Sequence, residues 1–240
     1  MKPVAAAFVF FTRLPLWKLK AFNIPVTYFK QVISYWAVVG WLTAGVMAGV
    51  LWLSAQLLPF SVAVVFAIVS RVLLTGALHE DGLADFFDGF GGGTTKERTL
   101  EIMKDSHIGT YGVLALILYF LLFYQLLVQL PLCLAIYAIL AADPLCKLIS
   151  SFIPVFLPYA RTEEASKAKV VYSKTSLVPL ITSLVFGLAP FFILIGYRLS
   201  LAILFPVCIF VILTLTMKRK IQGYTGDCCG AIFLLTELSC

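Results

Sequence analysis

Apolar residues occur along this chain in long runs rather than with the short periods of a soluble helix or strand. A membrane-spanning helix needs about 20 mostly apolar residues, because it must cross a hydrocarbon core about 30 Å thick. Six runs approach that length: Val32–Leu53, Val62–Leu78, Val113–Leu130, Leu132–Ile153, Leu177–Ile195 and Leu199–Met217. The pattern therefore predicts an all-α polytopic integral membrane protein with about six transmembrane helices.

Two further segments are apolar but too short to span a bilayer. The segment before the first run is rich in aromatic side chains and is typical of an interfacial position. The run Ala231–Cys240 covers only about 15 Å as a helix. We therefore expect an interfacial N-terminal segment and a short C-terminal apolar helix.

Composition supports the membrane assignment. Hydrophobic residues make up 61% of the 240 residues and charged residues 12%, against about 45–50% and 25% in soluble domains. Mean hydropathy is +1.00. A soluble protein of this size could not bury so much apolar surface, which excludes a water-soluble enzyme, a disordered chain and a secreted disulfide scaffold.

Basic residues are distributed unevenly between the predicted loops. Of 18 Lys and Arg residues, 15 lie in the N-terminal segment or in the loops after spans two, four and six, and only Arg198 lies in the opposite loops. The positive-inside rule places the N-terminus and the long loops in the cytoplasm. We expect a multi-pass protein of the cell inner membrane with its active site facing the cytoplasm. The net charge of +6 is explained in this way, so no nucleic-acid partner is expected.

Acidic residues cluster at the end of the second span, where seven of 12 lie between Glu80 and Asp105. On a helix, Asp81, Asp85 and Asp88 fall within about 60° of each other, whereas Glu80 points about 100° away. Aligned carboxylates repel one another, and a divalent cation with a preference for oxygen ligands would remove that cost. The three aspartates are therefore candidate metal ligands. The alternative is a solvated helix end with a flexible loop, but this would not explain why the three aspartates lie on one face of the helix.

The residues after this cluster suggest phosphate chemistry. Gly82 and Gly89 would let a bulky ligand approach the helix backbone, and 91–93 is a glycine run that would end the helix. Donors that could hold phosphate oxygens follow in the loop, namely Arg98, Lys104 and His107, and Asp105 could ligate a metal or orient a donor. An amphipathic interfacial helix explains the same spacing equally well.

Ionisable residues inside the predicted spans are functional candidates by default. Asp143 and Lys147 stand four residues apart, which suits either a functional site or a structural ion pair. Arg71 could act as counter-ion to the acidic cluster or extend to the interface. Glu237 is expected to face protein rather than lipid.

A family resemblance extends over nearly the whole chain. The stretch from His79 to Gly89, HEDGLADFFDG, resembles the His-x-Asp-Gly-Leu-Ala-Asp-x-x-Asp-Gly signature of the cobalamin synthases, also called adenosylcobinamide-GDP ribazoletransferases. Four more blocks resemble that family in the same order: 11–15 (FTRLP), 100–110 (LEIMKDSHIGT), 159–164 (YARTEE) and 224–231 (YTGDCCGA) with Glu237. One departure is Ala-Ser-Lys at 165–167, where the family has Gly-Leu-Gly.

The resemblance implies the condensation of adenosylcobinamide-GDP with α-ribazole, or its 5′-phosphate, to adenosylcobalamin, or its 5′-phosphate, and GMP. It also implies Mg²⁺ as cofactor and allows association with other cobalamin-assembly enzymes in the lipid bilayer. The expected catalytic residues are Asp81, Asp85, Asp88 and His79, of which the first three would hold the metal and Asp88 would accept a proton. The expected substrate-binding residues are Arg98, Lys104, Asp105, His107, Arg161, Thr225 and Asp227. Residues 1–240 would form a single membrane-embedded domain, with 79–112 as its cytoplasmic catalytic loop.

Two other functions are compatible with acids at a membrane boundary. A CDP-alcohol phosphotransferase also uses spaced Asp and Gly on a membrane helix, but its signature has Arg after the Ala, where this chain has Asp85. A cation transporter could use the acids as an ion path, but it would be expected to repeat the motif in two halves. No second copy of the motif occurs in this chain.

Overall fold

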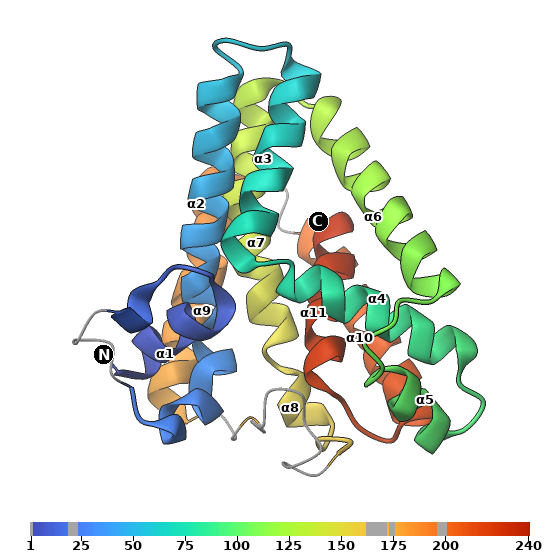
Figure 1. Ribbon diagram of the computed structural model, residues 1–240. Coiled ribbons are helices and arrows are strands. Elements are labelled where there is room, and N and C mark those ends of the chain that lie inside the picture. Colours follow the sequence, from blue (N-terminus) through green and yellow to red (C-terminus); the bar gives the residue numbers. More distant parts are fainter. Residues whose placement is uncertain (1, 19–23, 162–171, 173–175, 196–200) are drawn as a thin grey trace.

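The computed structural model describes residues 2–18, 24–161, 172, 176–195 and 201–240, and it is helical through most of these ranges (Figure 1). The α-helices are α1 (Lys2–Phe11), α2 (Trp36–Ser54), α3 (Phe60–Thr75), α4 (Leu78–Gly92), α5 (Lys96–Ile102), α6 (Thr110–Val128), α7 (Leu132–Ser150), α8 (Ile153–Phe156), α9 (Leu177–Leu194), α10 (Leu204–Lys220) and α11 (Gly226–Leu238). Before α2, the described residues include the 3₁₀ segments η1 (Leu16–Lys18) and η3 (Val26–Tyr35).

Among the residues that the structure describes, five helices are long and apolar enough to cross a membrane, and a sixth span results if the bent pair α3–α4 is counted as one. The prediction of a polytopic all-α membrane protein is therefore confirmed. In Figure 1 the short helices α1, α5 and α8 lie at the lower end of the molecule. The α2–α3 and α6–α7 connections lie at the upper end. The segments 162–171 and 173–175, which carry most of the basic residues in the loop after the fourth predicted span, are outside the described residues.

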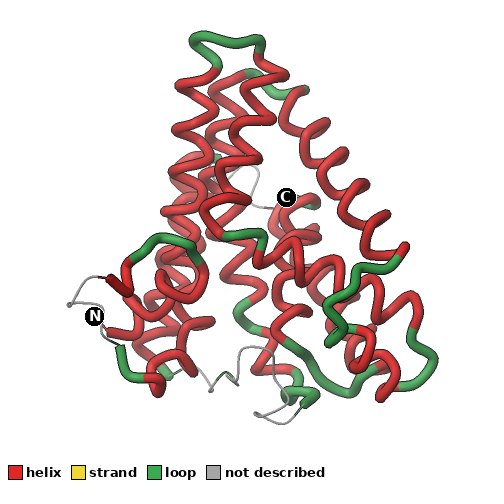
Figure 2. Tube along the Cα trace, viewed as in Figure 1, coloured by secondary structure: helices red, strands yellow, loops and turns green. Residues whose placement is uncertain are grey.

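The second predicted span, Val62–Leu78, ends at Thr75 in the structure, because the chain turns by 88° between α3 and α4 (Figure 2). Gly76 and Ala77 have φ angles of 67° and 57°. A residue in this left-handed region is a common way to end a helix, and glycine adopts it at little cost. The acidic segment is therefore a separate helix that crosses beneath α3, not a continuation of the span.

The backbones of α11 and α4 approach each other closely at two glycines. A Cβ atom at Gly82 would lie 2.8 Å from the carbonyl oxygen of Asp227, and one at Gly230 would lie 3.0 Å from that of His79. A Cβ at Gly89 would lie 3.0 Å from the carbonyl oxygen of Thr99. Gly82 and Gly89 thus make room for the protein backbone, which corrects the expectation that they leave space for a ligand.

Four charged residues form a buried network between α3, α7 and α11. Arg71 lies 2.5 Å from Glu237 and 3.8 Å from Asp143, and Asp143 lies 2.5 Å from Lys147. Arg71 also donates a hydrogen bond to the Tyr119 hydroxyl (2.6 Å). The sequence suggested that Arg71 is a counter-ion of the acidic cluster or extends to the interface. Both predictions are wrong, because Arg71 is buried and pairs with Glu237. Asp143 and Lys147 form the ion pair that was one of the two alternatives for them, and Glu237 faces protein as predicted.

Candidate active site

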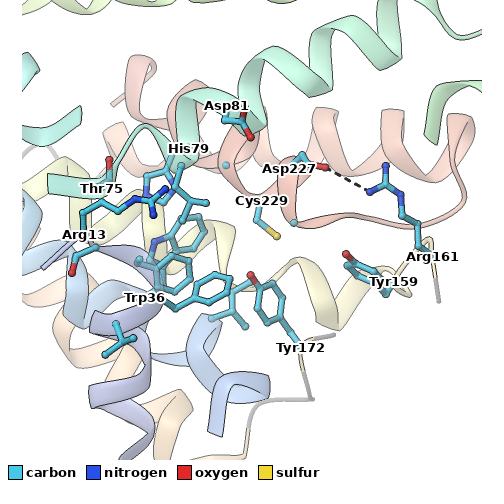
Figure 3. Close-up of a pocket in the computed structure, with 18 residues that line it drawn as sticks. Arg13, Trp36, Thr75, His79, Asp81, Tyr159, Arg161, Tyr172, Asp227 and Cys229 are labelled. Carbon is cyan, nitrogen blue, oxygen red and sulfur yellow. Dashed lines mark ion pairs between the residues drawn. The ribbon is translucent and has the colours of Figure 1, made fainter. Parts of the chain in front are cut away.

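A cavity of about 370 Å³ opens where α1, α4 and α11 meet (Figure 3). Its apolar part is formed mainly by the end of α1 and the start of α2, and its charged part by the starts of α4 and α11 and by the segment after α8. The lining includes Phe10, Phe11, Arg13, Ile33, Trp36, Thr75, His79, Asp81, Tyr159, Arg161, Tyr172, Asp227 and Cys229. Four of the predicted site residues, at positions 79, 81, 161 and 227, thus share one cavity.

The charged part of this first cavity is built by pairing two distant segments. The backbone N–H of Ala160 donates to the Tyr224 carbonyl (2.8 Å), and that of Tyr224 donates to the Pro158 carbonyl (2.9 Å). This pairing brings Arg161 to 4.0 Å from Asp227. Arg161 also donates to the Leu100 carbonyl (2.7 Å). Arg161 thereby connects α5 to the start of α11.

Thr225 contributes to the site through the backbone. Its hydroxyl accepts a hydrogen bond from the N–H of Cys228 (3.4 Å) and caps α11, as threonine commonly does at a helix start. The side chain is buried and does not line the cavity. Thr225 was predicted to bind substrate, but its contacts favour a positioning role. Its hydroxyl lies 3.3 Å from the carboxylate of the neighbouring Asp227 and helps to hold it in place.

His79 is held by aromatic rings instead of by a carboxylate. Its ring centroid lies 5.2 Å from that of Trp36, 5.1 Å from that of Phe233 and 6.2 Å from that of Phe11. Its side chain is buried, and Nε2 has no hydrogen-bond partner among the described residues. A buried imidazole nitrogen without a partner is unfavourable, so Nε2 is a candidate to bind a substrate group.

Asp88 is not among the residues that line this cavity, and it caps another helix, α6. Its two carboxylate oxygens accept hydrogen bonds from the backbone N–H groups of Gly109 (2.7 Å) and Gly112 (2.8 Å) at the start of α6. A Cβ at Gly109 would lie 2.5 Å from the Asp88 carboxylate, which explains the glycine. Both carboxylate oxygens of Asp88 are already hydrogen-bonded. These contacts favour a structural role for Asp88, whereas the sequence predicted a metal ligand and proton acceptor.

A second cavity of about 370 Å³ lies at the far end of α4, between α5 and the start of α6. Three predicted binding residues, Arg98, Asp105 and His107, line it together with Asp88. His107 contacts Asp105 at 2.7 Å through Nδ1 and donates its backbone N–H to the same oxygen, and these bonds lower the pKa of Asp105. Lys104 is exposed and lines neither cavity. The sequence grouped these residues with His79 and Asp81 in one site, but the structure places Arg98, Asp105 and His107 in a cavity separate from theirs.

Comparisons with known proteins place the chain in a family. The family model described as cobalamin-5-phosphate synthase matches residues 3–240. The chain belongs to the cobalamin-5-phosphate synthase family. The adenosylcobinamide-GDP ribazoletransferase of Shewanella baltica (strain OS185) is 38% identical over 234 residues, covering 96% of this chain and 88% of that protein. That of Shewanella oneidensis is 35% identical with the same coverage.

Membership in the cobalamin-5-phosphate synthase family makes the chain a transferase of cobalamin biosynthesis. No solved structure matches this chain.

The carboxylates fit a magnesium ion only in part. Among the described residues, no three His, Cys, Asp or Glu side chains lie close enough together to hold a metal ion. Asp81 and Asp227 do line one cavity, and Mg²⁺ is commonly held by one or two carboxylates together with substrate phosphates. Burial raises the pKa of the adjacent Cys228 to about 12, so this thiol stays protonated and does not compete as a ligand. The donor set therefore suits a hard cation whose coordination the substrate completes.

One charged cavity residue, Arg13, was missing from the predicted site. Arg13 belongs to the short block 11–15 that resembles the family, but nothing in its local pattern marked it as a ligand. It reaches the cavity because its backbone N–H donates to the Leu74 carbonyl (2.7 Å), across 61 residues of sequence. The presence of an arginine inside the resembling block was the available signal.

Proposed function

We propose that this chain catalyses the reaction for which its relatives are named. Adenosylcobinamide-GDP would react with α-ribazole, or with its 5′-phosphate, to give the complete cobamide and GMP. The observation that carries this proposal is the convergence of Asp81, Asp227 and Arg161 in one cavity of a chain 38% identical to a ribazoletransferase. Two carboxylates and a guanidinium are suited to bind a metal–pyrophosphate group.

The proposed step forms and breaks one phosphorus–oxygen bond. A ribose hydroxyl oxygen attacks the phosphorus atom that carries the cobinamide arm, and the bond from this phosphorus to the GMP phosphate breaks. GMP leaves with the bond's electron pair, and the hydroxyl proton passes to a carboxylate. We assign this proton to Asp81, which is exposed in the cavity, in place of Asp88.

Mg²⁺ is proposed as the cofactor, and it would neutralise the charge that develops on the departing phosphate. Asp81 and Asp227 would hold it, and Asp85 lies one helical turn from Asp81 on the same face of α4. Arg161 would orient the phosphate oxygens, since its guanidinium is already fixed by the Leu100 carbonyl.

The second cavity is proposed to bind the guanine nucleotide part of the same substrate. Arg98 and His107 offer donors there, and Asp105 orients His107 through their hydrogen bonds. From Asp81 to Asp88 the axis of α4 rises about 10 Å, which is the scale of a nucleotide measured from its phosphates to its base. A substrate lying along α4 could therefore reach both cavities.

We propose that both cavities face the cytoplasm. Basic residues at 96, 98 and 218–220 lie near the end of α4 that borders the second cavity. Lys96 contacts Gln222, and Lys220 donates to the Phe90 carbonyl. The positive-inside rule places an end of the protein that is rich in basic residues on the cytoplasmic side of the inner membrane. Association with other cobalamin-assembly enzymes would also occur at this face.

The proposal is tested by incubating the purified protein in lipid nanodiscs with adenosylcobinamide-GDP, α-ribazole and Mg²⁺. GMP should appear in a one-to-one ratio with the new cobamide, and only when both substrates are present. GMP release without α-ribazole would identify a hydrolase instead. No GMP under any condition, from protein with intact helical content, would refute the proposal.

A further inference from the structure

Arg13 is a cavity residue to which the proposed reaction assigns no role. Its backbone is fixed to the end of α3 by the hydrogen bond to Leu74, and its side chain extends over the α3–α4 bend. A Cβ at Gly76 would lie 2.5 Å from Cγ of Arg13, so glycine is needed there for the side chain to pass. The bend thus places the exposed Arg13 in the cavity lining, beside His79 (Figure 3).

The two arginines of the cavity differ in what they already bind. Arg161 donates to Leu100 and lies near Asp227, as described above. The guanidinium of Arg13 has no hydrogen bond or ion pair with any residue in the described ranges. Figure 3 shows the two arginines on opposite sides of the cavity, with Asp81 and Asp227 between them in the view. Arg13 is therefore available to an anion distinct from the one beside Asp227.

The part of the cavity next to Arg13 is lined by aromatic side chains, of which Phe11 and Trp36 are almost fully buried. Phe11, two residues before Arg13, stacks on Trp36 with ring centroids 4.9 Å apart, and Phe10 and Ile33 line the same part of the cavity. Such a wall favours a flat, mostly apolar ring system. A benzimidazole has a single free acceptor nitrogen, whereas guanine has several donors and acceptors that this wall would leave unpaired.

We propose that Arg13 binds the 5′-phosphate of the ribazole substrate, whose base lies against Phe10, Phe11 and Trp36. This inference rests on the proposed function. A nucleotide carries its 5′-phosphate one ribose away from its base, and Arg13 and Phe11 line the same cavity. The pyrophosphate of the other substrate belongs on the opposite side, with Asp81, Asp227 and Arg161. A guanidinium recognises a phosphate by paired, charge-assisted hydrogen bonds.

The experiment compares α-ribazole 5′-phosphate with α-ribazole as acceptors for the full-length protein in nanodiscs. GMP release is measured for the wild type, for Arg13→Gln and for Arg13→Lys. Arg13→Gln should lower kcat/KM for the 5′-phosphate about tenfold to a hundredfold, mainly through KM, because a charged hydrogen bond is lost. With α-ribazole as acceptor, kcat/KM should fall by less than about threefold, because this substrate has no 5′-phosphate and loses no charged hydrogen bond. Arg13→Lys should fall between, since it keeps the charge but not the paired geometry.

Lys18→Gln provides the matched control, because it removes one positive charge from the same segment at an exposed residue outside the cavity. Equal losses with both acceptors would overturn the inference. A raised KM for adenosylcobinamide-GDP would also overturn it, by placing Arg13 on the pyrophosphate. Binding of α-ribazole 5′-phosphate is measured separately by calorimetry. Binding that weakens in Arg13→Gln supports the inference even if the wild type releases no GMP, a result that would count against the proposed function alone.

Discussion

The buried pair of Arg71 and Glu237 should contribute far more to stability than an exposed pair of the same chemistry. The two side chains lie 2.5 Å apart and are 1% and 3% exposed. Removing one partner of such a pair leaves an uncompensated buried charge, which costs about 3 kcal/mol. Asp143, at 3.8 Å, offsets only part of this cost because it also pairs with Lys147. For a chain of this length, Glu237→Gln should therefore lower Tm by about 6–12 °C.

Glu101→Gln is the matched control. Arg98 and Glu101 lie 2.7 Å apart, but their side chains are 57% and 69% exposed. Exposed pairs contribute about 0–1 kcal/mol, so Tm should fall by no more than about 4 °C.

Unfolding is followed in detergent by the reaction of buried thiols with a fluorogenic maleimide, since Cys146, Cys228 and Cys229 are free and buried. The double variant Arg71→Met with Glu237→Met should recover most of the lost stability, because it leaves no unpaired charge on either residue. Equal melting temperatures for Glu237→Gln and Glu101→Gln would refute the reasoning.

Three other predictions concern α6, the topology and the metal. Asp88→Asn should destabilise the protein by about 1–3 kcal/mol, because one backbone N–H at the start of α6 loses its acceptor; an unchanged Tm in the thiol assay would contradict the capping role. A cysteine introduced at the exposed Thr95 should react with an impermeant maleimide only in inverted vesicles, and one at the exposed Gln56 only in intact cells; the reverse pattern would invert the topology. Adenosylcobinamide-GDP and Mg²⁺ should each tighten binding of the other by the same factor in calorimetry, whereas a Mg²⁺ affinity that ignores the substrate would exclude a shared site.

The spans could be predicted from sequence because lipid requires every backbone polar group to be paired within its own helix. The runs that became α6, α7 and α9 needed no knowledge of their neighbours. The α3–α4 bend was harder, although a glycine directly after the apolar run of α3 was a usable helix-end signal. Periodicity alone favoured a continuous helix, because Val62–Leu78 stays apolar beyond Gly76 in the sequence.

Long-range pairings could not be predicted from local spacing. The helical period correctly aligned Asp88 with Asp81, but it could not show that the Asp88 oxygens bind N–H groups 21 and 24 residues further along. The partner of Arg71 is 166 residues away in sequence. Arg13 enters the site for the same kind of reason, through contacts made at the α3–α4 bend.

The central claim, that the transfer takes place in the cavity between α4 and α11, is tested most directly by the rate of GMP release from Asp227→Asn. We expect a loss of at least about a hundredfold in kcat, as for removal of a group that acts on the transition state, with Tm unchanged. Glu97→Gln, which neutralises an exposed acid on α5 outside both cavities, should retain the wild-type rate. A wild-type rate of GMP release in Asp227→Asn at limiting Mg²⁺ would contradict this location of the active site.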